Sequence, residues 1–72
     1  MTRTKIRLDT LSDVNQFVAT MSTLKEQVWL EDDDGNHVSA KSLLGALYSL
    51  EWQRIYCYCE RDINAYLMPW MV

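Results

Sequence analysis

The feature that most constrains this chain is a run of turn-forming residues, Asp32-Asp33-Asp34-Gly35-Asn36, between two segments of alternating polarity. An Asp-Gly pair favours a tight reversal, because glycine adopts a left-handed backbone without steric cost. Residues 27–31 place Val28 and Leu30 on one face, and a returning strand begins at His37. The pattern predicts a β-hairpin, and therefore an antiparallel pair of strands.

Residues 4–8 are predicted to form the first strand, because apolar Ile6 and Leu8 alternate with charged Lys5 and Arg7. In an antiparallel sheet, one face commonly packs on the core while the other meets solvent or a partner. We therefore expect Lys5 and Arg7 to lie on the exposed face.

Residues 54–59 alternate in the same way and predict the last strand, with Tyr56 and Tyr58 on the face opposite Cys57 and Cys59. Two cysteines on the same face of one strand are poorly placed to bond to each other. Two thiols also fall short of the four ligands of a structural zinc site. We expect buried free thiols and no metal site.

A first helix is predicted to follow Thr10, whose side chain suits the N-cap, with Asp13 at the third helical position as in a capping box. Apolar residues at helical spacing form its stripe: Leu11, Val14, Phe17, Val18 and Met21. We expect this stripe to face the sheet.

A second helix is predicted after Ser39 or Ser42, either of which can serve as the N-cap. Its expected stripe consists of Leu43, Ala46, Leu47 and Leu50. Gly45 is a poor helix former, which is acceptable where something packs close to it. A last helix over residues 62–68 is expected to end at Pro69.

The predicted order is strand, helix, two hairpin strands, helix, strand, helix, which favours an α+β fold with an antiparallel sheet and helices on one face. Residues 1–72 contain no linker or repeat, so we expect a single domain. No signal peptide or membrane segment is recognisable, which indicates a cytoplasmic protein.

Composition and charge argue against several functions. The net charge of −3, with only 7 Lys and Arg, predicts no binding of nucleic acid. The chain also lacks the residues of a self-contained active site, so we expect neither an enzyme nor a cofactor.

The segment Ala40-Lys41-Ser42-x-x-Gly45, directly after a hairpin and at the start of a helix, resembles the histidine-containing phosphocarrier (HPr) family of the bacterial sugar phosphotransferase system. The predicted element order is similar to that family over nearly the whole chain. The resemblance implies an open-faced β-sandwich of four antiparallel strands, with the last strand between the first and second. It also implies three helices covering one face of the sheet.

The resemblance places the family's phosphoacceptor histidine at Thr10 and its phosphate-binding arginine near Ser12. Threonine does not form the phosphoimidazole that the carrier requires, so the usual carrier site is lost. His37 is an alternative phosphoacceptor, but it lies on the hairpin beside three aspartates, with no arginine nearby in sequence. We expect His37 to be an ordinary surface residue.

Ser42 matches the serine that a dedicated kinase phosphorylates in many members of the family. A phosphate there would meet free amides at a helix N-terminus, with Lys41 beside it. The alternative is that Ser42 is simply an N-cap.

Leu43, Leu44 and Leu47 fall where the family presents an apolar patch to protein partners, beside the start of the first helix. Three leucines this close cannot all point inward. We expect Leu43 and Leu47 to belong first to the core and Leu44 to a docking surface.

If the strand order follows the family, the uncovered sheet face carries aromatic residues beside cations: Trp29, Tyr56, Tyr58, Lys5 and Arg7. Such residues are typical of interfaces, because they bury a large area with few rotamers to freeze. They also suit an exposed sheet face that binds nothing. A homodimer joined through this face therefore remains an alternative.

The chain ends in an apolar segment, residues 66–72. Either it docks over the edge of the core or it forms a contact in a homodimer. The leading hypothesis is a non-catalytic regulatory or protein-binding relative of the phosphocarriers, with partners among phosphotransferase-system or catabolite-regulation proteins. A genuine phosphocarrier is the runner-up.

Overall fold

The computed structural model describes residues 2–72 and contains one four-stranded antiparallel sheet with the strand order β1-β4-β2-β3. The strands are β1 (Thr2–Ile6), β2 (Val28–Glu31), β3 (His37–Ser39) and β4 (Ile55–Cys59). The last strand therefore lies between the first and the second, as the resemblance implies.

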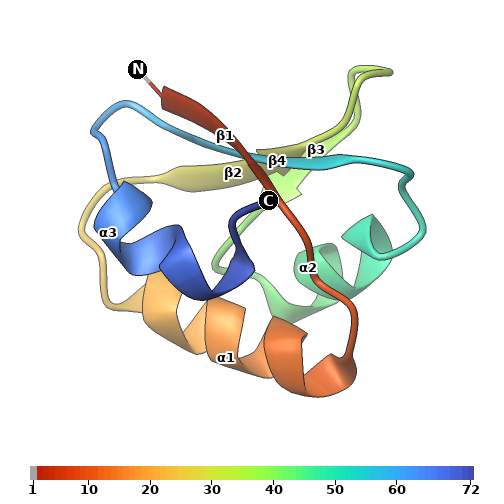
Figure 1. Ribbon diagram of the computed structural model, residues 1–72, viewed down its shortest axis with the longest axis horizontal. Helices are drawn as coiled ribbons and strands as arrows, with labels where there is room; N and C mark the ends of the chain where they lie inside the picture. The colour runs from red at the N-terminus through yellow and green to blue at the C-terminus, as the bar shows by residue number, and fades with distance from the viewer. Residues whose placement is uncertain (1) are drawn as a thin grey trace.

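Three helices lie on one side of this sheet, α1 (Leu11–Ser22), α2 (Leu43–Ser49) and α3 (Asn64–Leu67), and a 3₁₀-helix, η1 (Met68–Trp70), follows α3 (Figure 1). The other side of the sheet is open. The predicted α+β class, with an antiparallel sheet and its helices on one face, is confirmed. No helix within residues 2–72 combines the length and apolar character that crossing a membrane requires.

The first strand ends two residues earlier than its alternation predicts. Leu8 is buried, but it lies beyond the strand, because the chain has already left β4 by that point. The N–H of Arg7 instead donates to the carbonyl of Trp70 at 2.8 Å, and the N–H of Val72 donates to the carbonyl of Lys5 at 3.3 Å. The end of the chain thus pairs with the free edge of β1.

This pairing favours a docked C-terminal segment over a dimer contact. Trp70 is buried, and its ring meets Phe17 edge-on with 5.3 Å between the ring centroids. The exposed large apolar side chains of this segment are Tyr66, Met68, Met71 and Val72. The last α-helix is also shorter than predicted, and Pro69 lies inside the 3₁₀-helix η1 that continues it.

The core face of α1 consists of Val14, Phe17 and Met21, as the apolar stripe predicts. Leu11 is the exception, because 59% of its surface is exposed. It lies two turns before Val18, which is itself only partly buried, so both residues occupy the edge of the stripe.

The hairpin forms as predicted, with a turn of five residues between its strands. Gly35 has φ of +89°, a conformation that favours glycine. The Asp32 carboxylate accepts hydrogen bonds from the N–H groups of Asp34 and Asn36 and from the Asn36 side chain. These bonds, led by the one from the Asn36 side chain, lower the pKa of Asp32.

Cys57 and Cys59 are buried free thiols on the core face of β4, as predicted. Burial raises the pKa of Cys57 to about 12. The thiolate is the reactive form of cysteine, so this side chain is inert at neutral pH.

The face that α2 turns toward the sheet differs from the prediction. Ala46 and Ser49 are its buried residues, whereas Leu43 and Leu50 are 45% and 37% exposed. Small residues recur at positions 42, 45, 46 and 49, which lie on one side of a helix. They let α2 approach the hairpin closely, and the larger leucines therefore point outward.

Gly45 occupies the closest approach. A Cβ placed on it would lie 3.0 Å from Cβ of Val38 and 3.3 Å from the carbonyl oxygen of Ser39. The glycine that is unfavourable for helix propensity is thus required by the packing of α2 on β3.

We predict that Gly45→Ala lowers the free energy of unfolding by about 1 kcal/mol, because overpacking of about 1–3 kcal/mol outweighs a helix-propensity gain of about 1 kcal/mol. Urea unfolding followed by circular dichroism measures the change. Asn15→Ala, at an exposed position of α1, is the control and should not destabilise. Stabilisation by both substitutions would contradict a close contact at Gly45.

Candidate functional site

The first candidate site is the start of α1, where the family has its phosphoacceptor. Thr10 is the N-cap and its Oγ1 accepts a hydrogen bond from the N–H of Asp13 at 3.1 Å. The Asp13 carboxylate in turn accepts from the N–H groups of Asp9 and Thr10, both at 3.1 Å. The predicted capping box is therefore complete, and a carboxylate of the chain itself occupies these donors.

These hydrogen bonds also change the acidity of Asp13. The bond from the N–H of Asp9, supported by bonds from Thr10, lowers the pKa of Asp13 below its ordinary value, and desolvation opposes this only in part. Since the folded state favours the charged form, Asp13 stabilises the fold above its unfolded pKa of about 3.9. This contribution is lost as the pH falls through the lower, folded pKa.

We predict that Asp13→Asn flattens the acid limb of the stability curve, below about pH 4. Thermal unfolding measured between neutral pH and this acid range tests the effect. Asp34→Asn is the matched control, because the Asp34 carboxylate has no hydrogen bond or ion pair with residues 2–72. An unchanged acid limb in Asp13→Asn would contradict the assigned capping role.

Ser42 is the N-cap of α2, and its Oγ accepts a hydrogen bond from the N–H of Gly45 at 3.1 Å. Of the two predicted caps, Ser42 is therefore the correct one. Lys41 does not lie ready beside Ser42, because its Nζ donates to the carbonyl of Leu24 at 2.5 Å. Its charge is held at the C-terminal end of α1.

That contact also places α2 relative to α1. The start of α2 therefore lies near the C-terminal end of α1, because Lys41 immediately precedes Ser42.

The exposed side of α2 forms an apolar surface, which we call the α2 surface. Its residues are Leu43, Leu44, Leu47 and Tyr48. Leu44 is 80% exposed, as predicted. Leu47 is partly buried against the core, as predicted, but Leu43 is exposed because small residues take the inward positions.

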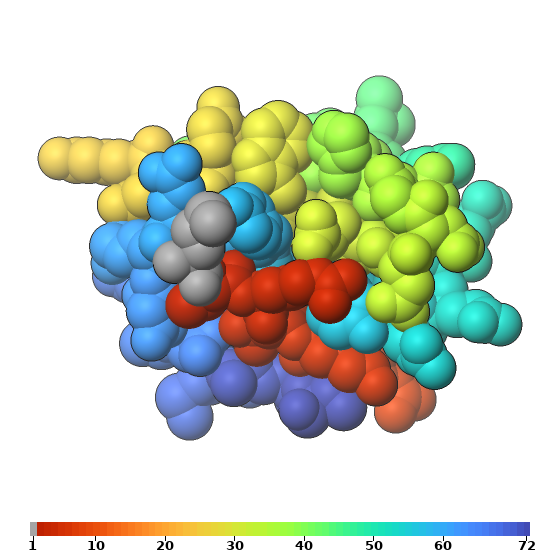
Figure 2. Space-filling view, turned by 90° about the horizontal axis from the view of Figure 1, so that it is seen from above, coloured from red at the N-terminus to blue at the C-terminus, as the bar shows by residue number. Residues whose placement is uncertain are grey.

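The open face of the sheet brings the three predicted aromatic residues together. Tyr58 on β4 lies opposite Trp29 on β2, and Tyr56 lies opposite Lys5 on β1. Figure 2 looks onto this face, where side chains of the strands lie at the surface with no helix over them.

The cation that contacts this cluster is Arg3, which sequence reasoning missed. Its guanidinium carbon lies 3.7 Å from the centroid of the Tyr56 ring, and its Nε lies 2.6 Å from Oε1 of Glu31. Arg7 was expected here instead, but it lies beyond the end of β1 and pairs with Asp9 at 2.8 Å. Extending the alternation two residues toward the N-terminus would have found Arg3.

His37 lies on the edge strand β3 and is exposed. Its ring meets Trp29 edge-on, with 5.7 Å between the ring centroids, and its strand partner is Glu31. No arginine or lysine of residues 2–72 is hydrogen-bonded to it or stacked on it. The surroundings of His37 are therefore those of an ordinary surface residue that packs against Trp29.

No group of three or more His, Cys, Asp or Glu side chains in residues 2–72 is arranged to hold a metal ion. Comparisons with protein-family models, with curated proteins and with solved structures found no match for this chain.

Proposed function

We propose that this chain is a divergent HPr-like domain of the phosphotransferase-system family that acts in the cytoplasm as a non-catalytic, regulatory protein-binding module. Its main contact surface is the α2 surface, with Ser42 as a candidate phosphorylation site. The open sheet face around Trp29, Tyr56 and Tyr58 is a second contact surface.

The observation that carries this proposal is the occupied start of α1. A phosphocarrier of this family needs a histidine at a helix N-terminus, where free N–H groups hold the phosphoryl group. Here the position carries Thr10, and the carboxylate of Asp13 takes the N–H groups of Asp9 and Thr10. A phosphoryl donor would find no histidine here and would meet the repulsion of Asp9 and Asp13.

The membership of the family is supported by two features. The strand order β1-β4-β2-β3 is the one that the resemblance implies. The Ala40-Lys41-Ser42-x-x-Gly45 motif also has a structural reason at each of its defined positions. Ala40 is buried, Lys41 binds the end of α1, Ser42 caps α2, and Gly45 admits the close approach to β3.

A protein partner is supported by the exposure of α2. This helix has seven residues, and three of them, Leu43, Leu44 and Tyr48, are large apolar side chains exposed to water. Neighbouring apolar side chains left exposed in this way are typical of protein-binding surfaces. Phosphate on Ser42 would add negative charge at the edge of this surface and alter the cap on Gly45, so it would change partner affinity.

The experiment uses the purified first enzyme of the phosphotransferase system with phosphoenolpyruvate, and separately a cytoplasmic extract with ATP. We predict no phosphorylation by the first enzyme, and an acid-stable phosphate on Ser42 from the extract that is absent in Ser42→Ala but present in Ser39→Ala. Intact mass before and after acid treatment distinguishes the two phosphates. An acid-labile phosphate on His37 would restore a carrier role.

Binding supplies the second part of this test. Leu44→Glu should weaken binding to the first enzyme, or to a catabolite-regulation protein of the system, by about tenfold or more, as loss of a central apolar contact does. Met68→Glu, at an exposed apolar position of η1, is the control and should bind normally. If Leu44→Glu bound the partner as tightly as Met68→Glu does, the α2 surface would not be the contact surface.

A further inference from the structure

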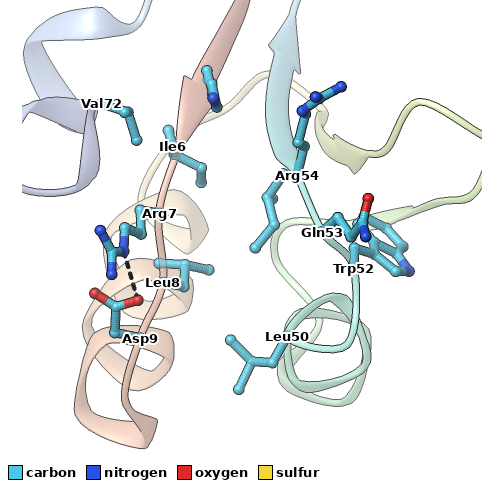
Figure 3. A pocket seen from close by; sticks show the side chains of 11 residues that line it. Ile6, Arg7, Leu8, Asp9, Leu50, Trp52, Gln53, Arg54 and Val72 are labelled. Atoms are coloured by element: carbon cyan, nitrogen blue, oxygen red, sulfur yellow. Dashed lines mark hydrogen bonds and ion pairs between the residues drawn. The ribbon is translucent and has the colours of Figure 1, made fainter.

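A cavity of about 450 Å³ opens between the segment that joins β1 to α1 and the loop that joins α2 to β4. Figure 3 shows Ile6 and Leu8 on one side and Leu50 on the other, pointing into the space between the two segments. Ile6, Leu8 and Ile55 are buried, so they form an apolar floor, while Leu50 is partly accessible on the wall. The volume falls in the range of roughly 300–1,000 Å³ typical of small-molecule sites.

The charges around this cavity oppose the charge of the whole chain. The chain has a net charge of −3 and only 7 Lys and Arg residues. Three of those cations, Lys5, Arg7 and Arg54, line the cavity, and Asp9 is the one acidic side chain among its lining residues. Like charges gathered around a hollow in the surface create a positive potential that attracts anions.

Two of these cations already have carboxylate partners. Arg7 donates from Nε to Asp9 at 2.8 Å, and Figure 3 shows both side chains turned away from Leu50 and Arg54. Arg54 donates from Nη1 to Asp33 at 2.9 Å and also interacts with Tyr56. The ammonium group of Lys5 makes no hydrogen bond or ion pair with residues 2–72. The cavity therefore has one cation without a counter-charge, Lys5, and one guanidinium group with further N–H donors, that of Arg54.

Trp52 provides a reporter beside the cavity. It belongs to the lining, and Figure 3 shows its ring turned away from the space between Leu8 and Leu50. Its Nε1–H is buried with no acceptor in residues 2–72, so the NMR signal of this group reports on changes in the loop that joins α2 to β4 rather than on direct contact with a ligand.

We infer that this cavity binds a small organic anion, a carboxylate or phosphate monoester that carries a compact apolar group. The anionic group lies between Lys5 and Arg54, where charge-assisted hydrogen bonds are available. The apolar group packs on the floor and against Leu50. The cavity shares no residue with the α2 surface, so this site stands apart from the proposed protein-binding function.

The test is a titration of the full chain followed by ¹H–¹⁵N NMR at constant ionic strength. The probes are phenyl phosphate and phenylacetate, with inorganic phosphate and neutral benzyl alcohol for comparison. We expect saturable shifts of the Trp52 indole N–H and of the amides of residues 7–9 and 53–55 with the first two probes. Whichever of them binds more tightly identifies the anionic group.

Lys5→Gln should weaken that binding by about tenfold, because an exposed cation is removed without loss of a native ion pair. Lys25→Gln is the matched control: Lys25 is an exposed lysine that does not line the cavity, and its removal should leave the affinity unchanged. Lys5→Arg keeps the charge and should retain binding. Its binding would show that the loss in Lys5→Gln comes from the missing charge and not from misfolding caused by substitution at this position.

Three results would overturn the inference. The first is attraction to net charge alone. It would appear as NMR shifts that rise linearly with probe concentration without saturating, or as an equal loss of probe affinity in Lys5→Gln and Lys25→Gln. The second is binding of benzyl alcohol as tight as that of the anions. The third is inorganic phosphate binding as tightly as phenyl phosphate, which would remove the apolar part of the site.

Discussion

The rest of the structure depends on the insertion of β4 between β1 and β2. The strand order of the sheet is β1-β4-β2-β3, so β1 is connected to the β2–β3 hairpin within the sheet only by strand pairing with β4. Ile55, Cys57 and Cys59 point from this central strand into the core, so all three are buried. The strand arrives late in the chain, and a thin sheet of this kind is complete only when residues far apart in sequence have paired.

Most of the fold could be predicted from local patterns, because the local and the long-range requirements agree. The Asp-Gly turn, the capping box of Thr10 and Asp13, and the alternation of β4 each have a short-range physical cause, and each lies where the sequence predicts it. The face of α2 was predicted only in part, because Ala46 and Leu47 pack toward the core as expected but Leu43 and Leu50 are exposed. Hydrophobic periodicity favours leucines as the buried side, whereas here the separation between helix and sheet is small, and only Gly45, Ala46 and Ser49 fit.

Predicting which residues share the open sheet face required the ends of the strands, and hydrophobic periodicity defines strand ends poorly. Placing β1 two residues late exchanged Arg3 for Arg7 as the cation of the open sheet face. The physical difference is large, because Arg3 stacks on Tyr56 and bonds to Glu31, while Arg7 turns to Asp9 at the other end of the strand. The pairing of β1 with β4 ends at Ile6, and the other edge of β1 pairs with the C-terminal segment, a long-range contact that no local pattern reveals.

The charges of the chain are separated in space around one loop. Arg54, Trp52 and Gln53 line the basic cavity and also a neighbouring hollow whose other lining residues include Asp32, Asp33, Asp34 and Glu51. The ion pair of Arg54 with Asp33 joins the two hollows, and the hydrogen bond from Arg54 lowers the pKa of Asp33. The hairpin carboxylates are thereby held on one side of the loop at neutral pH. Lys5 is left on the other side without a counter-charge, which is why a net acidic domain presents a cavity suited to anions.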